Sequence, residues 1–209
     1  MAGYQVRPRR RQDVEGVAAS VRRAMDLDPL LPLPGVELFE KVRRYQVSST
    51  RGAISLSYGV EEVLEDGALA CAMYDEIEGE RVITLLLSAD SYEDLEKRGG
   101  RARFSVAHEI GHAVLHADRL IDITKIDHKR RAMLRSDATP TPPYRDSEWQ
   151  ANAFAAGFLM PGPGLEYLEK ASRLTPRALS RMYGVSELSA THRISAFDRN
   201  RVDILTGWR

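Results

Sequence analysis

Cysteine and long apolar runs are scarce in this sequence. The single cysteine, Cys71, excludes an intramolecular disulfide and any cysteine-rich zinc module. The longest apolar-rich stretches, residues 82–87 and 151–160, fall short of the roughly 20 residues that cross a membrane. The basic N-terminal run is followed by polar residues instead of the apolar segment of a secretion signal. We therefore expect a cytoplasmic protein with no membrane partner.

The sequence as a whole also lacks an excess of positive or negative charge, although several of its segments carry one. Thirty Lys and Arg residues balance thirty Asp and Glu residues, which argues against a uniformly basic nucleic-acid binder. By segment the net charge is +4 over residues 1–52, −9 over 53–128, zero over 129–169 and +5 over 170–209. We expect the acidic segment to attract a divalent cation and to steer a basic protein toward it.

The hydrophobic periodicity predicts helices at both ends of the chain with strands between them, which favours an α+β fold. The predicted strands cover residues 53–60, 68–74 and 81–87, and turn signals make the last two an antiparallel hairpin. The predicted helices cover residues 13–25, 35–44, 101–116, 147–160, 176–183 and 186–197. Residues 117–146 are expected to be irregular. The prediction is thus a small antiparallel sheet packed against helices, with a helical C-terminal part.

One motif carries chemistry, and it is the HExxH run from His108 to His112. Residues four apart lie on one face of a helix, so both imidazoles can bind one cation, each nitrogen about 2.1 Å from zinc. Glu109 projects beside them, where a carboxylate can take a proton from a metal-activated water. His116 continues the series, but it lies about 12 Å from His108 along the helix axis. We expect His116 to support a ligand rather than to bind the metal.

A second predicted helix begins with a capping box in which Ser147 is the N-cap and Gln150 its partner. Glu148 and Asn152 lie four apart on it, so Glu148 can reach the metal while Asn152 orients a ligand. Small residues on this helix and Gly111 on the first would let the two helices approach closely. Spacing alone leaves several candidates for the third ligand: Glu148, Asp118, Asp122, Asp127, Asp137 and Asp146.

Two blocks, RFSVAHEIGHAVLH at residues 103–116 and EWQANAFAAGFLMP at residues 148–161, resemble the paired signature of the ImmA/IrrE family. These metallopeptidases are similar to HExxH zinc proteases. The resemblance implies that His108, His112 and Glu148 bind zinc and that Glu109 is the general base. Manganese or another divalent ion also suits two imidazoles and a carboxylate.

The resemblance further implies a domain organisation and a function. Residues 1–52 would form an N-terminal helical region, residues 53–164 the zinc metallopeptidase core, and residues 165–209 a helix-turn-helix-like module. Family members typically cleave a helix-turn-helix repressor or antitoxin, so we expect an endopeptidase of that kind. The long connection at residues 117–147 departs from the family pattern and leaves substrate selection open. Neither Tyr144 nor His128 within it can be named as an oxyanion stabiliser.

The C-terminal segment offers an alternative function. Residues 178–194 resemble a helix-turn-helix, and residues 170–209 carry eight basic against three acidic residues, as a DNA contact would require. The apolar spacing becomes irregular at Arg193 and Ile194, which favours docking of a protein over reading of DNA. The alternative is therefore a DNA- or protein-binding regulator with a non-catalytic metal site.

Overall fold

The computed structural model describes residues 4–64, 67–97, 100–124 and 142–209. Its strands are β1 (Gln46–Ser49), β2 (Gly52–Glu61), β3 (Ala70–Ile77) and β4 (Glu80–Ser88). Its helices are α1 (Arg11–Ala24), α2 (Leu38–Arg43), α3 (Ala89–Glu96), α4 (Gly100–Thr124), the short 3-10 turn η2 (Pro143–Arg145), α6 (Ser147–Leu159), α7 (Gly162–Lys170), α8 (Pro176–Tyr183) and α9 (Glu187–Gly207). The α+β fold class is confirmed.

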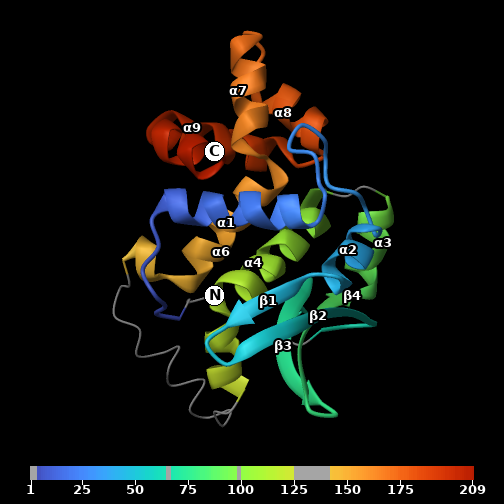
Figure 1. The fold of residues 1–209 in the computed structure, drawn as a ribbon. Helices are drawn as coiled ribbons and strands as arrows, with labels where there is room; N and C mark the ends of the chain where they lie inside the picture. Colours follow the sequence, from blue (N-terminus) through green and yellow to red (C-terminus); the bar gives the residue numbers. More distant parts are fainter. Residues whose placement is uncertain (1–3, 65–66, 98–99, 125–141) are drawn as a thin grey trace.

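The sheet has the strand order β1-β2-β4-β3 and lies at one end of the molecule (Figure 1). β3 and β4 form the predicted antiparallel hairpin, in register from Ala70 opposite Leu87 to Ile77 opposite Glu80. β2 and β4 run parallel, so the prediction of a purely antiparallel sheet is wrong and the sheet is mixed. Because β4 lies between β2 and β3 in the sheet, β3 is an outer strand, and it packs beside α4.

Several elements differ from the sequence prediction. The strand β1 and the helices α3 and α7 were not predicted, and α9 continues ten residues beyond the predicted end at Phe197. The helix α4 continues beyond His116 to Thr124, so the prediction of an irregular chain from residue 117 is wrong for that stretch. The backbone at His116 is non-helical (φ −127°, ψ 22°), which marks a kink within α4. Residues 125–141 of the predicted connection lie outside the described residues.

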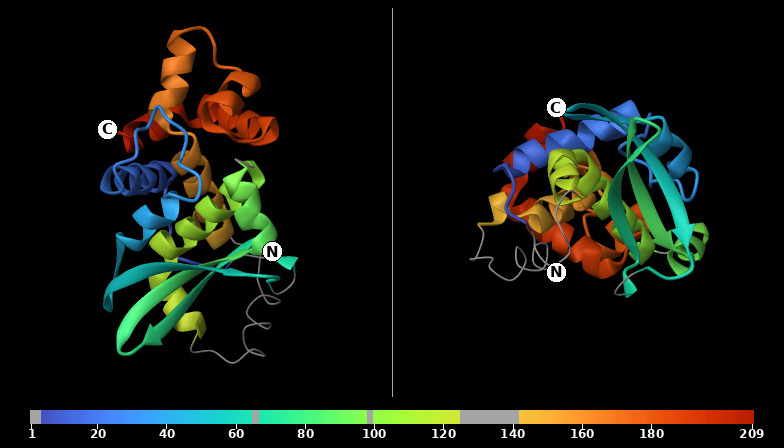
Figure 2. Two further views of the ribbon diagram at one scale, coloured as in Figure 1. Left: turned by 90° about the vertical axis from the view of Figure 1, so that its right-hand side faces the viewer. Right: turned by 90° about the horizontal axis from the view of Figure 1, so that it is seen from below.

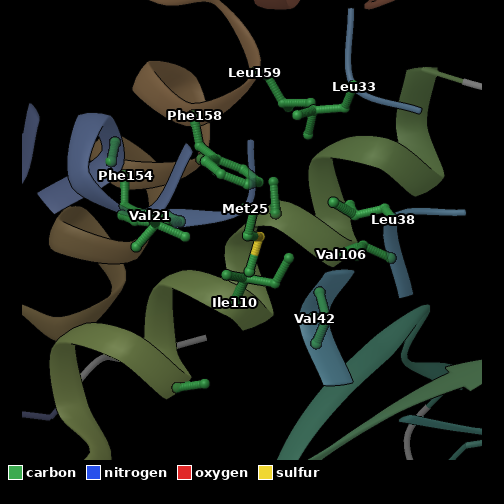
Figure 3. Packing of buried hydrophobic residues seen from close by; sticks show 14 of the residues in the cluster. Val21, Met25, Leu33, Leu38, Val42, Val106, Ile110, Phe154, Phe158 and Leu159 are labelled. Atoms are coloured by element: carbon green, nitrogen blue, oxygen red, sulfur yellow. The ribbon is translucent and has the colours of Figure 1, made fainter. Parts of the chain in front are cut away.

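The hydrophobic core is one cluster, and its centre lies where α1, α4 and α6 meet (Figure 3). Val21 of α1, Ile110 of α4 and Phe158 of α6 are each fully buried there. The helices α7, α8 and α9 lie at the end of the molecule opposite the sheet, with α1 between (Figures 1 and 2). No described helix is both long enough and apolar enough to span a membrane.

A buried ion pair joins the first and last helices. The Arg193 guanidinium of α9 donates two hydrogen bonds to the Glu15 carboxylate of α1, at 2.5 and 3.0 Å, and both side chains are fully buried. Trp208 Nε1 donates to the same carboxylate, and Arg193 Nε donates to the Met160 carbonyl. The polar residue that broke the apolar spacing of the helix-turn-helix-like segment therefore faces the core.

The N-terminal segment before α1 pairs with the chain that leads into α6. Val6 N–H donates to the Arg145 carbonyl, and Arg9 N–H donates to the Tyr144 carbonyl. Ser147 N–H donates to the Tyr4 carbonyl, while Ser147 Oγ accepts from Tyr4 N–H. The N-cap of α6 is Asp146, whose side chain accepts from Glu148 N–H, so the predicted capping box on Ser147 is wrong.

Candidate metal centre

Close packing of α4 on α6 brings the candidate ligands together. A Cβ placed on Gly111 would lie 3.0 Å from Phe154 Cδ1 and 3.3 Å from the Ala151 backbone. A side chain at residue 111 would therefore hold the two helices apart, which explains a glycine in the middle of a helix. The predicted packing role of Gly111 is thus supported by the observed contacts.

Three donor atoms converge at this contact. The Nε2 atoms of His108 and His112 lie 2.9 Å apart, and they lie 3.4 and 3.3 Å from the two carboxylate oxygens of Glu148. Among the residues described by the structure, these three side chains form the group whose donor atoms could hold a metal ion. Donor atoms of a tetrahedral site with bonds of about 2.1 Å lie about 3.4 Å apart, so the donor set and its spacing fit zinc.

Glu109 lies next to this cluster on the side of the sheet. Its carboxylate accepts a hydrogen bond from the backbone of Ala72 in the outer strand β3. Burial raises the pKa of Glu109 above its ordinary value, although the nearby imidazoles of His108 and His112 act in the opposite direction. A raised carboxyl pKa lies closer to neutral pH, which suits a group that both takes and returns a proton.

Hydrogen bonds between Glu148 and the two histidines shift the pKa values of His108 and Glu148. Burial alone would lower the pKa of His108, but its hydrogen bond to Glu148 and the nearby charge of Glu109 outweigh burial and raise it. Burial would raise the pKa of Glu148, yet hydrogen bonds to His108 and His112 hold it well below its ordinary range. Glu148 is therefore an anion at neutral pH, as a metal ligand must be.

The two predicted supporting residues contact the far nitrogens of the histidines. Asn152 Oδ1 lies 3.1 Å from His108 Nδ1, and His116 Nδ1 lies 3.2 Å from His112 Nδ1. His116 is buried, and burial together with the nearby His112 lowers the pKa of His116 to about 3. His116 thus contacts a ligand without joining the metal-binding group.

Sequence reasoning missed Gln150. Its side chain is fully buried, and its Oε1 atom lies 3.1 Å from His116 Nε2. The sequence signal was a polar residue beside the buried Ala151 and Phe154, but the capping-box pattern offered a simpler interpretation. Because Asp146 caps the helix instead, the Gln150 side chain is available for the site.

The other candidate ligands are engaged elsewhere or undescribed. Asp118 accepts hydrogen bonds from the backbone and hydroxyl of Thr50, and Asp122 forms an ion pair with Arg51. Asp146 caps α6. The structure does not describe Asp127, Asp137 or His128. Tyr144 lies before α6 with an exposed side chain, and its carbonyl accepts a hydrogen bond from Gln150.

A groove of about 430 Å³ runs beside the cluster between α6 and α9. Asn152 belongs both to this groove and to the surroundings of His108. Its large apolar side chains are Phe104, Trp149 and Leu188, and polar side chains, among them Arg11 and His192, also line it; the Arg11 guanidinium lies over the Trp149 ring. The groove is therefore suited to an apolar side chain of a bound polypeptide.

The fold and the cluster define an α+β protein with an HExxH helix and a candidate third metal ligand on a second helix. The family model Peptidase_M78, described as the IrrE N-terminal-like domain, matches residues 95–195. This match supports the resemblance of the chain to the ImmA/IrrE family. No curated protein matches the sequence.

A solved structure of a Mycobacterium tuberculosis transcriptional regulator is similar in fold, with a TM-score of 0.50 and 19% sequence identity. The match covers 90% of this chain and 48% of the regulator, so this chain spans about half the length of that protein. At this identity the similarity concerns the fold alone.

Proposed function

We propose that this protein is a zinc-dependent endopeptidase that cleaves a partner protein at a specific site. The observation that carries the proposal is the convergence of His108, His112 and Glu148 beside the partly buried carboxylate of Glu109. A catalytic zinc site has three protein ligands and leaves a position for water, whereas a structural site is closed by a fourth ligand. The match of residues 95–195 to the Peptidase_M78 family model supports the same function.

The side chains have distinct roles in the proposed reaction. His108, His112 and Glu148 would hold the ion, which supplies Lewis acidity and lowers the pKa of water toward neutrality. Glu109 takes a proton from the attacking water as the water oxygen adds to the peptide carbonyl carbon. Glu109 then returns that proton to the nitrogen of the leaving amine as the C–N bond breaks.

The substrate that we propose is a helix-turn-helix repressor or antitoxin. Such proteins are basic where they bind DNA, and residues 53–128, which contain β3 and the HExxH helix, carry a net charge of −9. The outer strand β3 offers an edge to which an extended peptide can add by backbone hydrogen bonds, next to Glu109. The groove between α6 and α9 would take an apolar substrate side chain.

The test is incubation of the zinc-loaded protein with candidate repressors from the same cell, with fragments read by mass spectrometry. We expect fragments from the wild type, none after a chelator, and none from Glu109→Gln, which keeps its zinc. His112→Ala is the matched control, because it should lose both zinc and cleavage. Fragments that persist with chelator, or a Glu109→Gln variant that cleaves at the wild-type rate, would contradict the proposed mechanism.

The second candidate is a regulator that binds DNA or a protein through α8 and α9 and keeps a non-catalytic metal. The similarity in fold to a transcriptional regulator favours this candidate, while the burial of Arg193 against Glu15 removes one cation from any DNA contact. A gel-shift titration across salt concentrations distinguishes the two. A DNA reader loses affinity steeply as salt rises, and an endopeptidase that docks proteins shows no specific shift.

A further inference from the structure

The Gln150 amide is fixed in one orientation by two backbone carbonyls. Its Nε2 atom donates to the Arg7 carbonyl and to the Tyr144 carbonyl, each at 2.9 Å. A carbonyl can only accept a hydrogen bond, so the NH₂ group must face these two oxygens. The Oε1 atom of Gln150 therefore faces His116 Nε2, at 3.1 Å.

This orientation determines where His116 carries its proton. Because Gln150 Oε1 is an acceptor only, His116 must hold a proton on Nε2 to make the hydrogen bond. A neutral imidazole with a proton on Nε2 has a lone pair on Nδ1. His116 Nδ1 lies 3.2 Å from His112 Nδ1, so His112 must supply the proton of that contact.

We propose that Gln150 is a positioning residue that, through His116, fixes the tautomer of His112, an inference that rests on the proposed metal site. With its proton on Nδ1, His112 presents the Nε2 lone pair to the position between His108 and Glu148. Metal-bound histidines generally donate their second ring N–H to a protein acceptor, which fixes their orientation. Here the acceptor is another histidine, and its own state is set by a buried amide.

The two metal-binding histidines are thus oriented by different arrangements. Asn152 Oδ1 accepts directly from His108 Nδ1, and Asn152 is exposed. Gln150 acts one residue further away, and it is fully buried and held by carbonyls of the N-terminal segment and of the chain before α6. The pairing of these two segments therefore contributes to the orientation of His112.

The first experiment measures zinc affinity by competition with a chelator, as a double-mutant cycle. Gln150→Leu should weaken binding about 10–100-fold, the usual cost of losing such a partner. The same substitution in a His116→Phe background should cost nothing further, because the route through His116 is already broken. Asn152→Leu is the matched control, and its loss should be the same in both backgrounds. An equal loss from Gln150→Leu in both backgrounds would overturn the proposal.

The second experiment reads the tautomer directly by nitrogen-15 NMR of the metal-free protein. Wild-type His116 should carry its proton on Nε2, and Gln150→Leu should remove this preference. A wild-type His116 with its proton on Nδ1 would overturn the proposal, even if the variants fail to fold. A wild type that binds no zinc would instead refute the proposed function, and the NMR result would still decide the tautomer.

Discussion

Gly111 is the point at which the structure predicts that one added methyl group will disturb the metal site. In Gly111→Ala the new Cβ would lie 3.0 Å from Phe154 Cδ1 and 3.3 Å from the Ala151 backbone. Unstrained carbon contacts lie at about 3.5–4.0 Å, so α4 and α6 must separate by about 0.5 Å. The affected atoms are buried, which leaves no open space for the side chain to turn into.

This displacement would act directly on the candidate metal ligands. Gly111 is adjacent to His112, and Ala151 lies one turn along α6 from Glu148. Metal–ligand distances tolerate about 0.2 Å and site geometry about 0.5 Å, so we expect zinc affinity to fall at least about tenfold. The free energy of unfolding should fall by at most about 2 kcal/mol, because two effects oppose each other. Replacing glycine within a helix gains about 1 kcal/mol, and overpacking costs about 1–3 kcal/mol.

Gly16→Ala is the matched control. Gly16 also lies within a helix, α1, but an added Cβ would meet only the Gly207 carbonyl oxygen, at an ordinary 3.5 Å. This variant should gain up to about 1 kcal/mol and keep its zinc affinity. The assays are chelator competition for zinc and guanidinium unfolding of the metal-free proteins. Wild-type zinc affinity in Gly111→Ala would refute the argument that close helix packing positions Glu148.

Three further predictions concern acid stability, the buried ion pair and the groove. Since the pKa of His116 is lowered to about 3, the unfolded chain binds a proton there below about pH 6.5 and the folded chain does not, so stability falls on acidification. Between pH 7 and 4.5 protonation of His116 in the unfolded chain should lower the free energy of unfolding by roughly 2–3 kcal/mol, as measured by urea unfolding of the metal-free wild type. An identical loss in His116→Phe would show the assignment to be wrong. Glu15→Leu leaves Arg193 as an uncompensated buried charge and should destabilise the protein by about 3–5 kcal/mol in the same assay. Adding Arg193→Met should recover part of that loss, and no recovery would contradict the pairing. Ala156→Leu narrows the groove between α6 and α9, so KM for the cleaved substrate should rise with zinc affinity unchanged. An unchanged KM would show that the groove does not bind the substrate.

Much of the candidate site could be predicted because it depends on short-range periodicity. The His108–His112 spacing and the Glu148–Asn152 spacing each place two side chains on one helix face, whatever the rest of the fold. Helix periodicity alone could not identify Glu148 as the third candidate ligand, because its distance from the histidines depends on how closely α4 and α6 pack. Only Gly111 and the small residues of α6 signalled that packing. The family resemblance supplied the choice among the carboxylates.

The features that were missed depend on contacts between distant segments. The parallel pairing of β2 with β4 depends on which strand edges meet, and the hairpin turn signals give no information on this. Gln150 was misread because its partners, Arg7 and His116, lie far away along the chain. The burial of Arg193 likewise depends on Glu15, 178 residues earlier. The periodicity of apolar residues identifies which face of a helix or strand is buried, but it does not identify the element that packs against that face.

The ion pair between Glu15 and Arg193 has a consequence for the order of folding during synthesis. The ribosome adds all the candidate metal ligands, the last at residue 148, before it reaches α9 and Arg193. Until then the buried face of α1 that carries Glu15 lacks its partner helix, so this contact between residues 178 positions apart must form late. Contacts of such high order slow folding, and uncovered apolar surface invites aggregation. Nascent chains that stop before α9 should therefore need chaperone protection, even though they already contain the complete HExxH cluster.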